Sequence, residues 1–287
     1  SSLLYAKHPS ELKLVFVDPK MVEFQEYRKL AKHYIATIPA NSEEEENDNI
    51  VVTDAKRAEE TLRSLLVEMD SRYNLMKEAR VNKLTEYNEK YKNRYLRPDL
   101  GHRYLPYLVV IVDEYADLIL SPGLGPEAKA VARSITTSIV RLAAKGRACG
   151  IHMIIATQRP SVDIITGPIK SNFPVKIAFR VSSLMDSRII IDAPGAEKLI
   201  GRGDLLFSTG VECERAQCAF VSMDEIAAIT KFIGSQTGFR EHYSTPYYLP
   251  EPPKETEESS GSGASSFDKG KLDPLFEEAA RMGVTTQ

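Results

Sequence analysis

The sequence predicts an α/β fold with a mostly parallel, buried β-sheet. The most apolar short segment is Tyr107–Val112, which ends at Asp113 and Glu114. Two more apolar segments rich in β-branched residues, Leu12–Val17 and Ile151–Ala156, have a similar character. Strands that helices cover on both faces read as near-continuous apolar runs. Helical patterns separate the three segments along the chain, which indicates an open sheet with parallel strands.

The part of the chain before Tyr107 contains one long helical pattern and two polar stretches. Apolar residues recur at spacings of three and four after Asp54, which predicts an amphipathic helix. Its apolar positions are Ala58, Leu62, Leu65, Met69, Tyr73 and Met76. We expect Ser42–Asn49, which contains four consecutive glutamates, to be a flexible acidic loop. We expect Tyr87–Arg103, which is rich in Tyr, Lys and Arg, to be an exposed connection.

The part after Tyr107 adds shorter elements and a change of composition near its end. We expect a helix at Pro126–Lys145, a fourth strand at Val175–Val181, short helices at Ser187–Ile191 and Glu197–Ile200, a hairpin from Asp204–Phe207 and Gln217–Val221, and a helix at Asp224–Ser235. Residues 249–272 combine Pro, Ser and Gly, which is typical of a flexible linker. Asp273 and Pro274 suit the start of another helix. The predicted organisation is a core over 1–248, a linker over 249–272 and the first helix of another domain over 273–287.

The overall composition excludes a protein that binds nucleic acid through its net charge. The formal charge is −3 over 287 residues, so a nucleic-acid surface would have to be a local concentration of Lys and Arg. The three cysteines lack the spacing of a metal site, and their odd number indicates reduced thiols. No apolar segment approaches the roughly 20 residues that cross a bilayer. We therefore expect a soluble intracellular protein or a soluble piece of a larger one.

Asp113 and Glu114 are the strongest candidates for chemistry. Carboxylates at the carboxyl end of a buried parallel strand lie where open α/β sheets bind ligands. In a nucleotide triphosphatase the first acid can hold the Mg²⁺ shell, and the second can orient or deprotonate the attacking water. The alternative is that the pair only caps the following helix.

Polar groups also flank the strand at Ile151–Ala156. Thr157 and Gln158 follow it, where a polar pair beside the carboxylates could sense a γ-phosphate; the alternative is a plain turn before Pro160.

A basic cluster precedes the same strand and consists of Arg141, Lys145 and Arg147. An Arg that enters a neighbouring subunit's nucleotide site would neutralise charge in the transition state. Spacing alone does not distinguish Arg141 from Arg147, and a solvated basic face is the alternative, preferred for Lys145.

Several segments together resemble the FtsK/SpoIIIE family of double-stranded DNA translocases. They are Val17–Glu23, Val112–Leu118, Gly146–His152, Ala156–Asp163, Asp186–Arg188 and Gly201–Asp204. The resemblance runs in order from about residue 1 to residue 245, and Asp273–Ala279 is similar to the opening helix of the family's winged-helix γ domain. It implies a RecA-like P-loop NTPase core that uses ATP and Mg²⁺ and assembles as a hexameric ring around duplex DNA. It also implies a cytoplasmic domain of a bacterial protein that is anchored in the inner membrane and acts in chromosome segregation at cell division.

The resemblance assigns roles to the candidate nucleotide site. It makes Asp113 the Walker B acid of the Mg²⁺ shell and Glu114 the catalytic base. Gln158 becomes the phosphate sensor, and Arg147 becomes the arginine finger that acts on a neighbouring subunit.

The resemblance also assigns DNA contacts. Arg159, Lys170 and Arg188 match the family's pore positions that touch the DNA backbone, and Leu184 stands where the family has a fourth basic residue. Ordinary surface charge is the alternative for Lys170 and Arg188.

The sequence departs from the family pattern at its start. The family carries the phosphate-binding loop G-x-x-G-x-G-K-[ST] before the helix whose last turns Ser1–Lys7 resemble, and this sequence contains no such motif. Its nearest substitute, Gly123–Pro126, lacks the Gly-Lys-Ser/Thr end.

We therefore predict that the chain by itself has negligible ATPase activity and weak nucleotide affinity. The measurement is steady-state ATP turnover by the isolated chain. Saturable turnover that Glu114→Gln abolishes would contradict the prediction.

Two other classes of function remain open on the sequence. A related ring ATPase could move proteins in specialised secretion or DNA in conjugation, and tandem motor domains would favour the secretion reading. A non-catalytic DNA-binding or assembly subunit could have lost the phosphate-binding loop. The retention of Asp113, Glu114, Gln158 and Arg147 argues against that subunit.

Overall fold

A four-stranded parallel sheet forms the centre of the protein. The computed structural model describes residues 1–120, 123, 125–237 and 246–252. The strand order is β3 (Val51–Val52), β1 (Leu12–Val17), β4 (Tyr107–Val112) and β5 (Ile151–Ile155). β1 and β4 pair along their whole length, from Leu12 opposite Tyr107 to Val17 opposite Val112. All three long strands lie where the sequence predicts them, and their carboxyl ends meet at one edge of the sheet.

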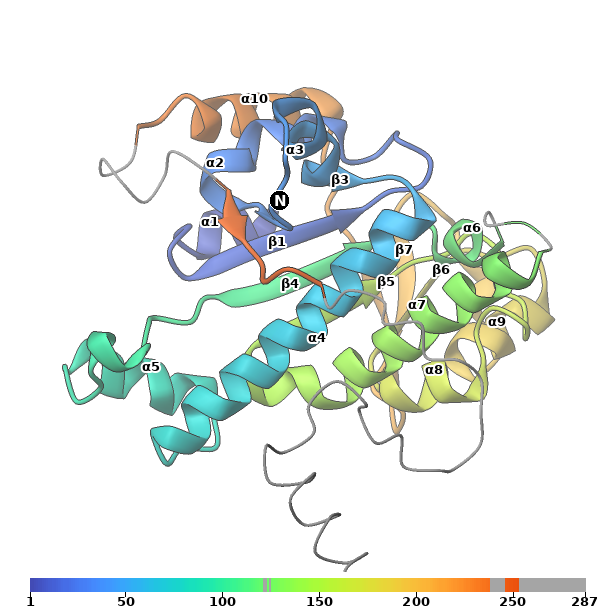
Figure 1. Cartoon of the computed structure of the whole chain (residues 1–287). Coiled ribbons are helices and arrows are strands. Elements are labelled where there is room, and N and C mark those ends of the chain that lie inside the picture. Colours follow the sequence, from blue (N-terminus) through green and yellow to red (C-terminus); the bar gives the residue numbers. More distant parts are fainter. Residues whose placement is uncertain (121–122, 124, 238–245, 253–287) are drawn as a thin grey trace, which may run out of the picture. The chain divides into compact units, whose positions relative to one another are not determined.

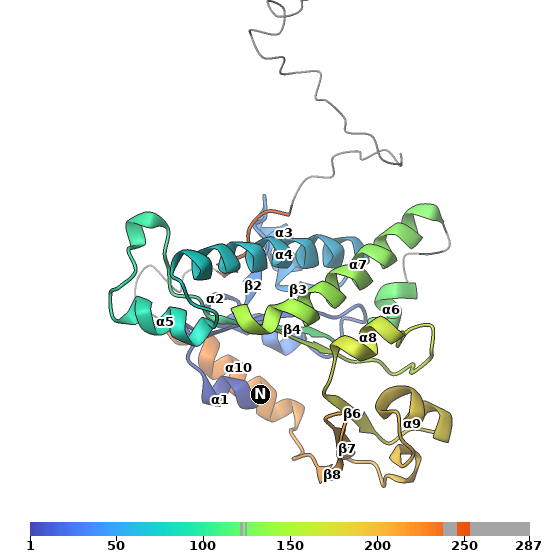
Figure 2. The same cartoon turned by 90° about the horizontal axis from the view of Figure 1, so that it is seen from below.

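Helices cover both faces of this sheet (Figures 1 and 2). One face carries α4 (Ala55–Glu78) and α7 (Pro126–Lys145), and the other carries η1 (Gln25–Leu30), α2 (Ala31–Tyr34) and α10 (Met223–Gly234). Alternate residues of β1 enter the two cores, with Val15 and Val17 on the α4 side and Leu14 and Phe16 on the α2 side. Full burial of each such side chain contributes about 1.5–3 kcal/mol. The two-sided burial explains why the strand sequences are apolar almost throughout.

Arg72 of α4 links the starts of two strands. Its side chain is fully buried, and its Nη1 donates to the carbonyl oxygens of Pro106 at 2.7 Å and Cys149 at 3.1 Å. Pro106 directly precedes β4 and Cys149 stands just before β5. The guanidinium Nε donates to Glu68 at 2.8 Å, so the buried cation has an anionic partner. This contact helps to set where β4 and β5 begin and therefore where both end.

A second, antiparallel sheet contains β6 (Lys176–Phe179), β7 (Asp204–Ser208) and β8 (Cys213–Gln217). The expected fourth strand is β6, and it pairs with β7 in this sheet. The expected hairpin forms from β7 and β8, but the prediction of its second strand at Gln217–Val221 is wrong, because only Gln217 belongs to β8. The amide of Thr209 donates to the carbonyl oxygen of Glu212 and closes a tight turn, so the second strand begins at Cys213. α9 (Leu184–Ile191) and η4 (Ala196–Lys198) pack against β6 through a small core around Ala178. Three short helices follow or precede strands in this half of the chain: α6 (Tyr115–Leu120), η3 (Gly146–Cys149) and α8 (Gly167–Asn172).

The prediction of a flexible loop at Ser42–Asn49 is wrong. The segment forms α3 (Glu43–Ile50), whose N-cap Ser42 accepts a hydrogen bond from the amide of Glu45 through its hydroxyl. Acidic residues near a helix N-terminus are favourable, and the cap satisfies a free amide. At the other end, the buried Ile50 anchors the helix to the core.

The prediction of an exposed connection at Tyr87–Arg103 is wrong for Tyr87–Lys92, which is helical, and for His102, which is buried. α5 (Leu84–Lys92) buries Tyr87 completely, and the Tyr87 hydroxyl lies 3.0 Å from Nδ1 of His102. Asn88 exchanges two hydrogen bonds with the backbone of Leu105. These partners are distant in the sequence, so local composition did not reveal them. The turn η2 (Pro98–Leu100) is exposed as expected.

A strap from the end of the described chain returns to the core. β9 (Tyr247–Tyr248) pairs in parallel with β2 (Ala36–Thr37), and the buried Leu249 donates to the carbonyl oxygen of Thr37 at 2.8 Å. Leu249 therefore belongs to the packed core, although the linker was expected to begin there. The rest of the expected linker from residue 253 and the expected helix at 273–287 lie outside the described residues.

At the start of the chain, α1 (Ser2–Ala6) forms the short helix that Ser1–Lys7 indicates. In the part of the chain that the structure describes, no helix has both the length and the apolar character that a membrane crossing requires.

Lys13 of β1 is a cation inside the core. It is 8% exposed, and its Nζ donates to the carbonyl oxygen of His33 at 2.6 Å. Burial lowers the pKa of Lys13 from 10.5 to about 8. Below pH 8 the folded protein must keep a buried charge, which costs stability. As the pH rises toward 10.5, the folded protein has released this proton while the unfolded chain still binds it, so the cost disappears.

We predict that the stability of the protein relative to its Lys13→Met variant rises with pH. The free energy of unfolding of the wild type should gain roughly 2–3 kcal/mol on the variant between pH 7 and pH 10. Denaturant unfolding at both pH values measures it. Lys56→Met, at an exposed position of α4, is the control and should show no such change. A difference between wild type and Lys13→Met that stays constant with pH would contradict the prediction.

Candidate functional site

The carboxyl ends of three parallel strands bring together the polar residues of the candidate site. Asp18 follows β1, Asp113 and Glu114 follow β4, and Thr157 comes shortly after β5. The strands are parallel neighbours in the order β1, β4, β5. Side chains that are far apart in the sequence therefore meet at one edge of the sheet.

Glu114 is the most tightly held member of this group. Its side chain is 1% exposed. Oε1 accepts a hydrogen bond from the Thr157 hydroxyl at 2.5 Å, and Oε2 accepts one from the Gln158 amide at 3.0 Å. Burial acts to raise the pKa of Glu114, but these two hydrogen bonds and the ammonium of Lys20 outweigh burial and lower it. The carboxylate is therefore ionised, as a general base must be.

Lys20 is a functional candidate that the sequence reasoning did not single out. Its Nζ lies 3.4 Å from Oε2 of Glu114 and 3.6 Å from Oδ2 of Asp117. The buried Asp18 fixes the turn that presents Lys20, because its carboxylate accepts from the amides of Lys20 and Glu23, both at 3.1 Å. The available signal was the position of Lys20, two residues beyond Asp18 at the end of the neighbouring strand.

Asp113 is half-buried beside Glu114 and has a different environment. In the described part of the chain its carboxylate accepts no hydrogen bond. Burial and the nearby Asp18, Glu23 and Glu114 raise the pKa of Asp113. A cation at this carboxylate would offset these effects by favouring its ionised form. Among the described residues no group of three or more His, Cys, Asp or Glu could hold a metal ion.

Gln158 lies beside Glu114, but through its backbone. Its amide is the donor to Glu114, whereas the residue itself is exposed. The Thr157 hydroxyl also accepts from the amide of Arg159 at 3.1 Å, which closes the turn after β5. The predicted polar pair therefore does stand next to the carboxylates, and its exposed amide side chain is open to a ligand.

The structure does not bring Arg147 to this site. Arg147 is exposed in η3, at the amino end of β5, whereas Gln158 lies past the carboxyl end. At about 3.3 Å per residue, β5 separates the two by on the order of 15 Å or more. Arg147 therefore cannot reach the Glu114 of its own chain without a rearrangement of the sheet.

The three basic residues predicted to contact DNA are partly brought together. Lys170 of α8 donates to the carbonyl oxygen of Arg188 at 3.4 Å, and Arg188 lies in the last turn of α9. Lys170 also forms an ion pair with Asp192 at 2.6 Å. Arg159 is 61% exposed and forms an ion pair with Asp117 at 3.4 Å. Leu184, at the start of α9, is 43% exposed.

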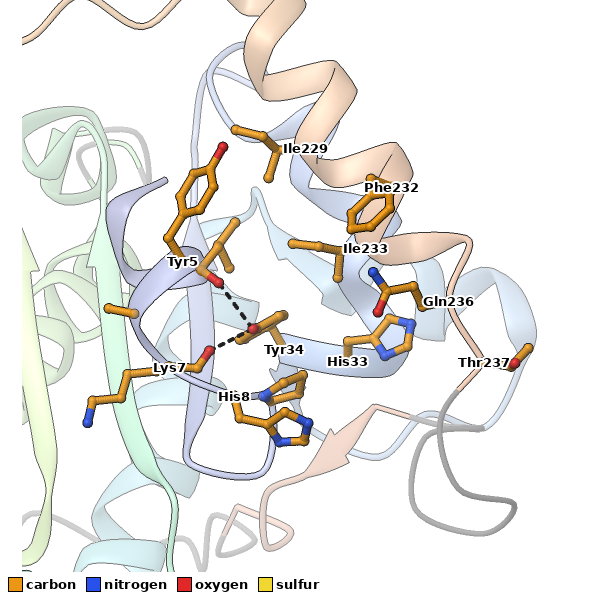
Figure 3. A pocket seen from close by; sticks show the side chains of 13 residues that line it. Tyr5, Lys7, His8, His33, Tyr34, Ile229, Phe232, Ile233, Gln236 and Thr237 are labelled. Carbon is orange, nitrogen blue, oxygen red and sulfur yellow. Dashed lines mark hydrogen bonds between the residues drawn. The ribbon is translucent and has the colours of Figure 1, made fainter.

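A pocket of about 960 Å³ lies elsewhere on the molecule (Figure 3). It is lined by α1, α2 and α10, near the amino end of β1, with Tyr5, His33 and Phe232 among its walls. The Tyr34 hydroxyl donates to the carbonyl oxygen of Lys7 at 2.7 Å across its floor. Among the described residues that line this pocket there is no carboxylate and none of the candidate site residues.

Comparison with known proteins relates this sequence to a family. The model of the FtsK/SpoIIIE family matches residues 1–162. The DNA translocase FtsK of Chlorobaculum tepidum is 45% identical over 100% of this chain and 32% of its own length. The DNA translocase FtsK of Treponema pallidum is 38% identical over 98% of this chain and 31% of its own length. The chain thus spans about a third of the length of these relatives.

Solved structures show the same fold. The pCW3 conjugation coupling protein TcpA, described in a monomer form with ATPγS, has a TM-score of 0.62 and 27% identity, covering 78% of this chain and 57% of TcpA. The cytoplasmic domain of the type VII secretion ATPase EccC from Thermomonospora curvata also has a TM-score of 0.62, with 19% identity, covering 86% of this chain and 26% of EccC. The expected RecA-like P-loop NTPase core with a mostly parallel sheet is confirmed.

Proposed function

The chain belongs to the FtsK/SpoIIIE family, and from that premise we propose that it forms the hydrolysing and DNA-contacting part of an ATP-driven motor for double-stranded DNA. The observation that carries the proposal is the buried, ionised Glu114, whose carboxylate is held by Thr157, Gln158 and Lys20 at the carboxyl edge of the sheet. Relatives described as DNA translocases match the chain along its length, which favours DNA over protein as the substrate.

In this proposal Glu114 takes a proton from the water that attacks the γ-phosphate. The two fixed donors, Thr157 and the Gln158 amide, hold the carboxylate in place, so little reorganisation is needed during the reaction. The Gln158 side chain, exposed beside Glu114, reports whether the γ-phosphate is present. The phosphates themselves require a loop of the kind that this sequence does not contain.

Asp113 is the residue that would hold Mg²⁺, through its hydration shell. A bound Mg²⁺ neutralises negative charge on the β- and γ-phosphates of ATP. Asp113 is suited to this role because its half-buried carboxylate lies among like charges and accepts no hydrogen bond from the described residues.

Arg147 serves a neighbouring subunit in this proposal. It is exposed at the edge of the sheet opposite to Glu114, so its own site cannot use it. A head-to-tail ring places one face of each subunit against the opposite face of the next, which brings such an Arg to the next site. The proposed assembly is a homo-hexamer.

Arg159, Lys170 and Arg188 contact the phosphate backbone of the duplex in this proposal. Contacts to phosphates are tolerant of sequence and depend strongly on salt. The proposed setting is the cytoplasmic domain of a protein anchored in the inner membrane, where the motor moves chromosomal DNA during division. Membrane contact would come through regions outside this chain.

We predict that Arg159→Ala combined with Lys170→Ala weakens duplex binding by the full-length gene product. Each phosphate contact removed should lower the slope of log affinity against log salt by about 0.9. Fluorescence anisotropy with duplexes of unrelated sequence, over a salt series, measures both quantities. Lys56→Ala combined with Lys77→Ala removes the same charge from exposed positions of α4 and is the matched control. If affinity and slope match those of the control, the assignment of the DNA surface is wrong.

A further inference from the structure

Three ion pairs form a continuous chain from the buried carboxylate to the protein surface. Glu114 pairs with Lys20 at 3.4 Å, Lys20 with Asp117 at 3.6 Å, and Asp117 with Arg159 at 3.4 Å. The side chains at its two ends are 1% and 61% exposed. This series of ion pairs therefore connects the proposed base to a residue that is accessible to a macromolecular ligand.

The two inner residues of this series each belong to two ion pairs, which makes the pairs interdependent. Lys20 has two carboxylates, Glu114 and Asp117, and Asp117 has two cations, Lys20 on Oδ2 and Arg159 on Oδ1. If a phosphate group drew Arg159 away, Lys20 would be the one cation left on Asp117 in these three ion pairs. The positive charge that repelled Lys20 is then gone, and Asp117 attracts Lys20 more strongly. Glu114 loses its hold on Lys20 as a consequence.

A second connection runs through the backbone. The amide of Arg159 donates to the Thr157 hydroxyl at 3.1 Å, and that hydroxyl donates to Glu114 at 2.5 Å. A displacement of Arg159 therefore reaches Glu114 through the turn after β5 as well as through the side chains. Both paths end on the same carboxylate.

We propose that Lys20 is a positioning residue that restrains Glu114 until duplex DNA takes Arg159 from Asp117. The inference rests on the proposed function, because it assumes that Arg159 meets DNA and that Glu114 acts on ATP. With Lys20 on Glu114, Oε2 accepts from both the Lys20 ammonium and the Gln158 amide, so neither of its lone pairs is free to take a proton. With Lys20 on Asp117, one lone pair of Oε2 is available, while Thr157 and the Gln158 amide still hold the carboxylate in place. DNA binding thus accelerates hydrolysis through Lys20.

The test is ATP turnover by the full-length gene product, without duplex DNA and with a saturating amount. Lys20→Met should raise the DNA-free kcat by roughly three- to tenfold and leave the KM for ATP unchanged. The ratio of kcat with DNA to kcat without DNA should then be close to one. Lys20→Arg keeps a cation at this position and should retain the wild-type stimulation. Asp117→Asn should also abolish the stimulation by DNA, but its kcat should stay low both with and without DNA, because Lys20 then stays on Glu114.

Lys56→Met, on an exposed part of α4, is the control and should behave like the wild type. A Lys20→Met variant that is slowed equally with and without DNA, or that keeps the wild-type stimulation, overturns the inference. If Lys20→Met does not fold, the other two variants decide the question, because Lys20→Arg should retain the stimulation by DNA and Asp117→Asn should lose it. Equal stimulation by DNA in these two variants overturns the inference. A wild type that hydrolyses no ATP, or whose hydrolysis does not respond to DNA, overturns the proposed function together with this inference.

Discussion

The parallel pairing of β1, β4 and β5 is the constraint on which the candidate site depends. Because these strands run in the same direction as neighbours, the residues that follow them meet at one edge. A shift of β4 by one residue would turn Glu114 away from Thr157 and exchange the two faces of the strand. Arg72, which contacts the backbone before β4 and before β5, supports this register from inside the core. The chemistry at the edge is therefore a consequence of contacts at the other end of the strands.

The same architecture separates two sets of charges. Glu114 is buried and ionised at the carboxyl edge, where an unpaired charge would be costly, and it is stabilised by a hydroxyl, an amide and the Lys20 ammonium. Arg147 is exposed at the opposite edge. In the proposed ring, one chain would carry both a site and the Arg that completes the site of its neighbour, so that each subunit contact completes one site.

The sequence was informative where a local pattern determines the structure. Continuous apolar runs predicted all three long strands, and Pro126–Lys145 was predicted as a helix with the bounds of α7. The acids at the end of the most apolar run predicted the place of the candidate site. Local patterns failed where distant partners decide the structure. Tyr87 is buried in the main core with its hydroxyl beside His102, and Lys20 became a candidate only because the sheet places it beside Glu114. The roles of the site residues remain predictions that rest on this geometry and on the family.

The most direct test of a site divided between subunits is a mixing experiment with two inactive variants of the full-length gene product. Glu114→Gln subunits lack the base but can donate Arg147, and Arg147→Ala subunits lack the donor but keep the base. Each variant alone should show little DNA-stimulated ATP turnover. Random assembly of equal amounts should restore turnover at roughly a quarter of the subunit contacts, where an intact Glu114 faces an intact Arg147. A mixture no more active than its two components, or an Arg147→Ala variant with wild-type activity, would contradict the account.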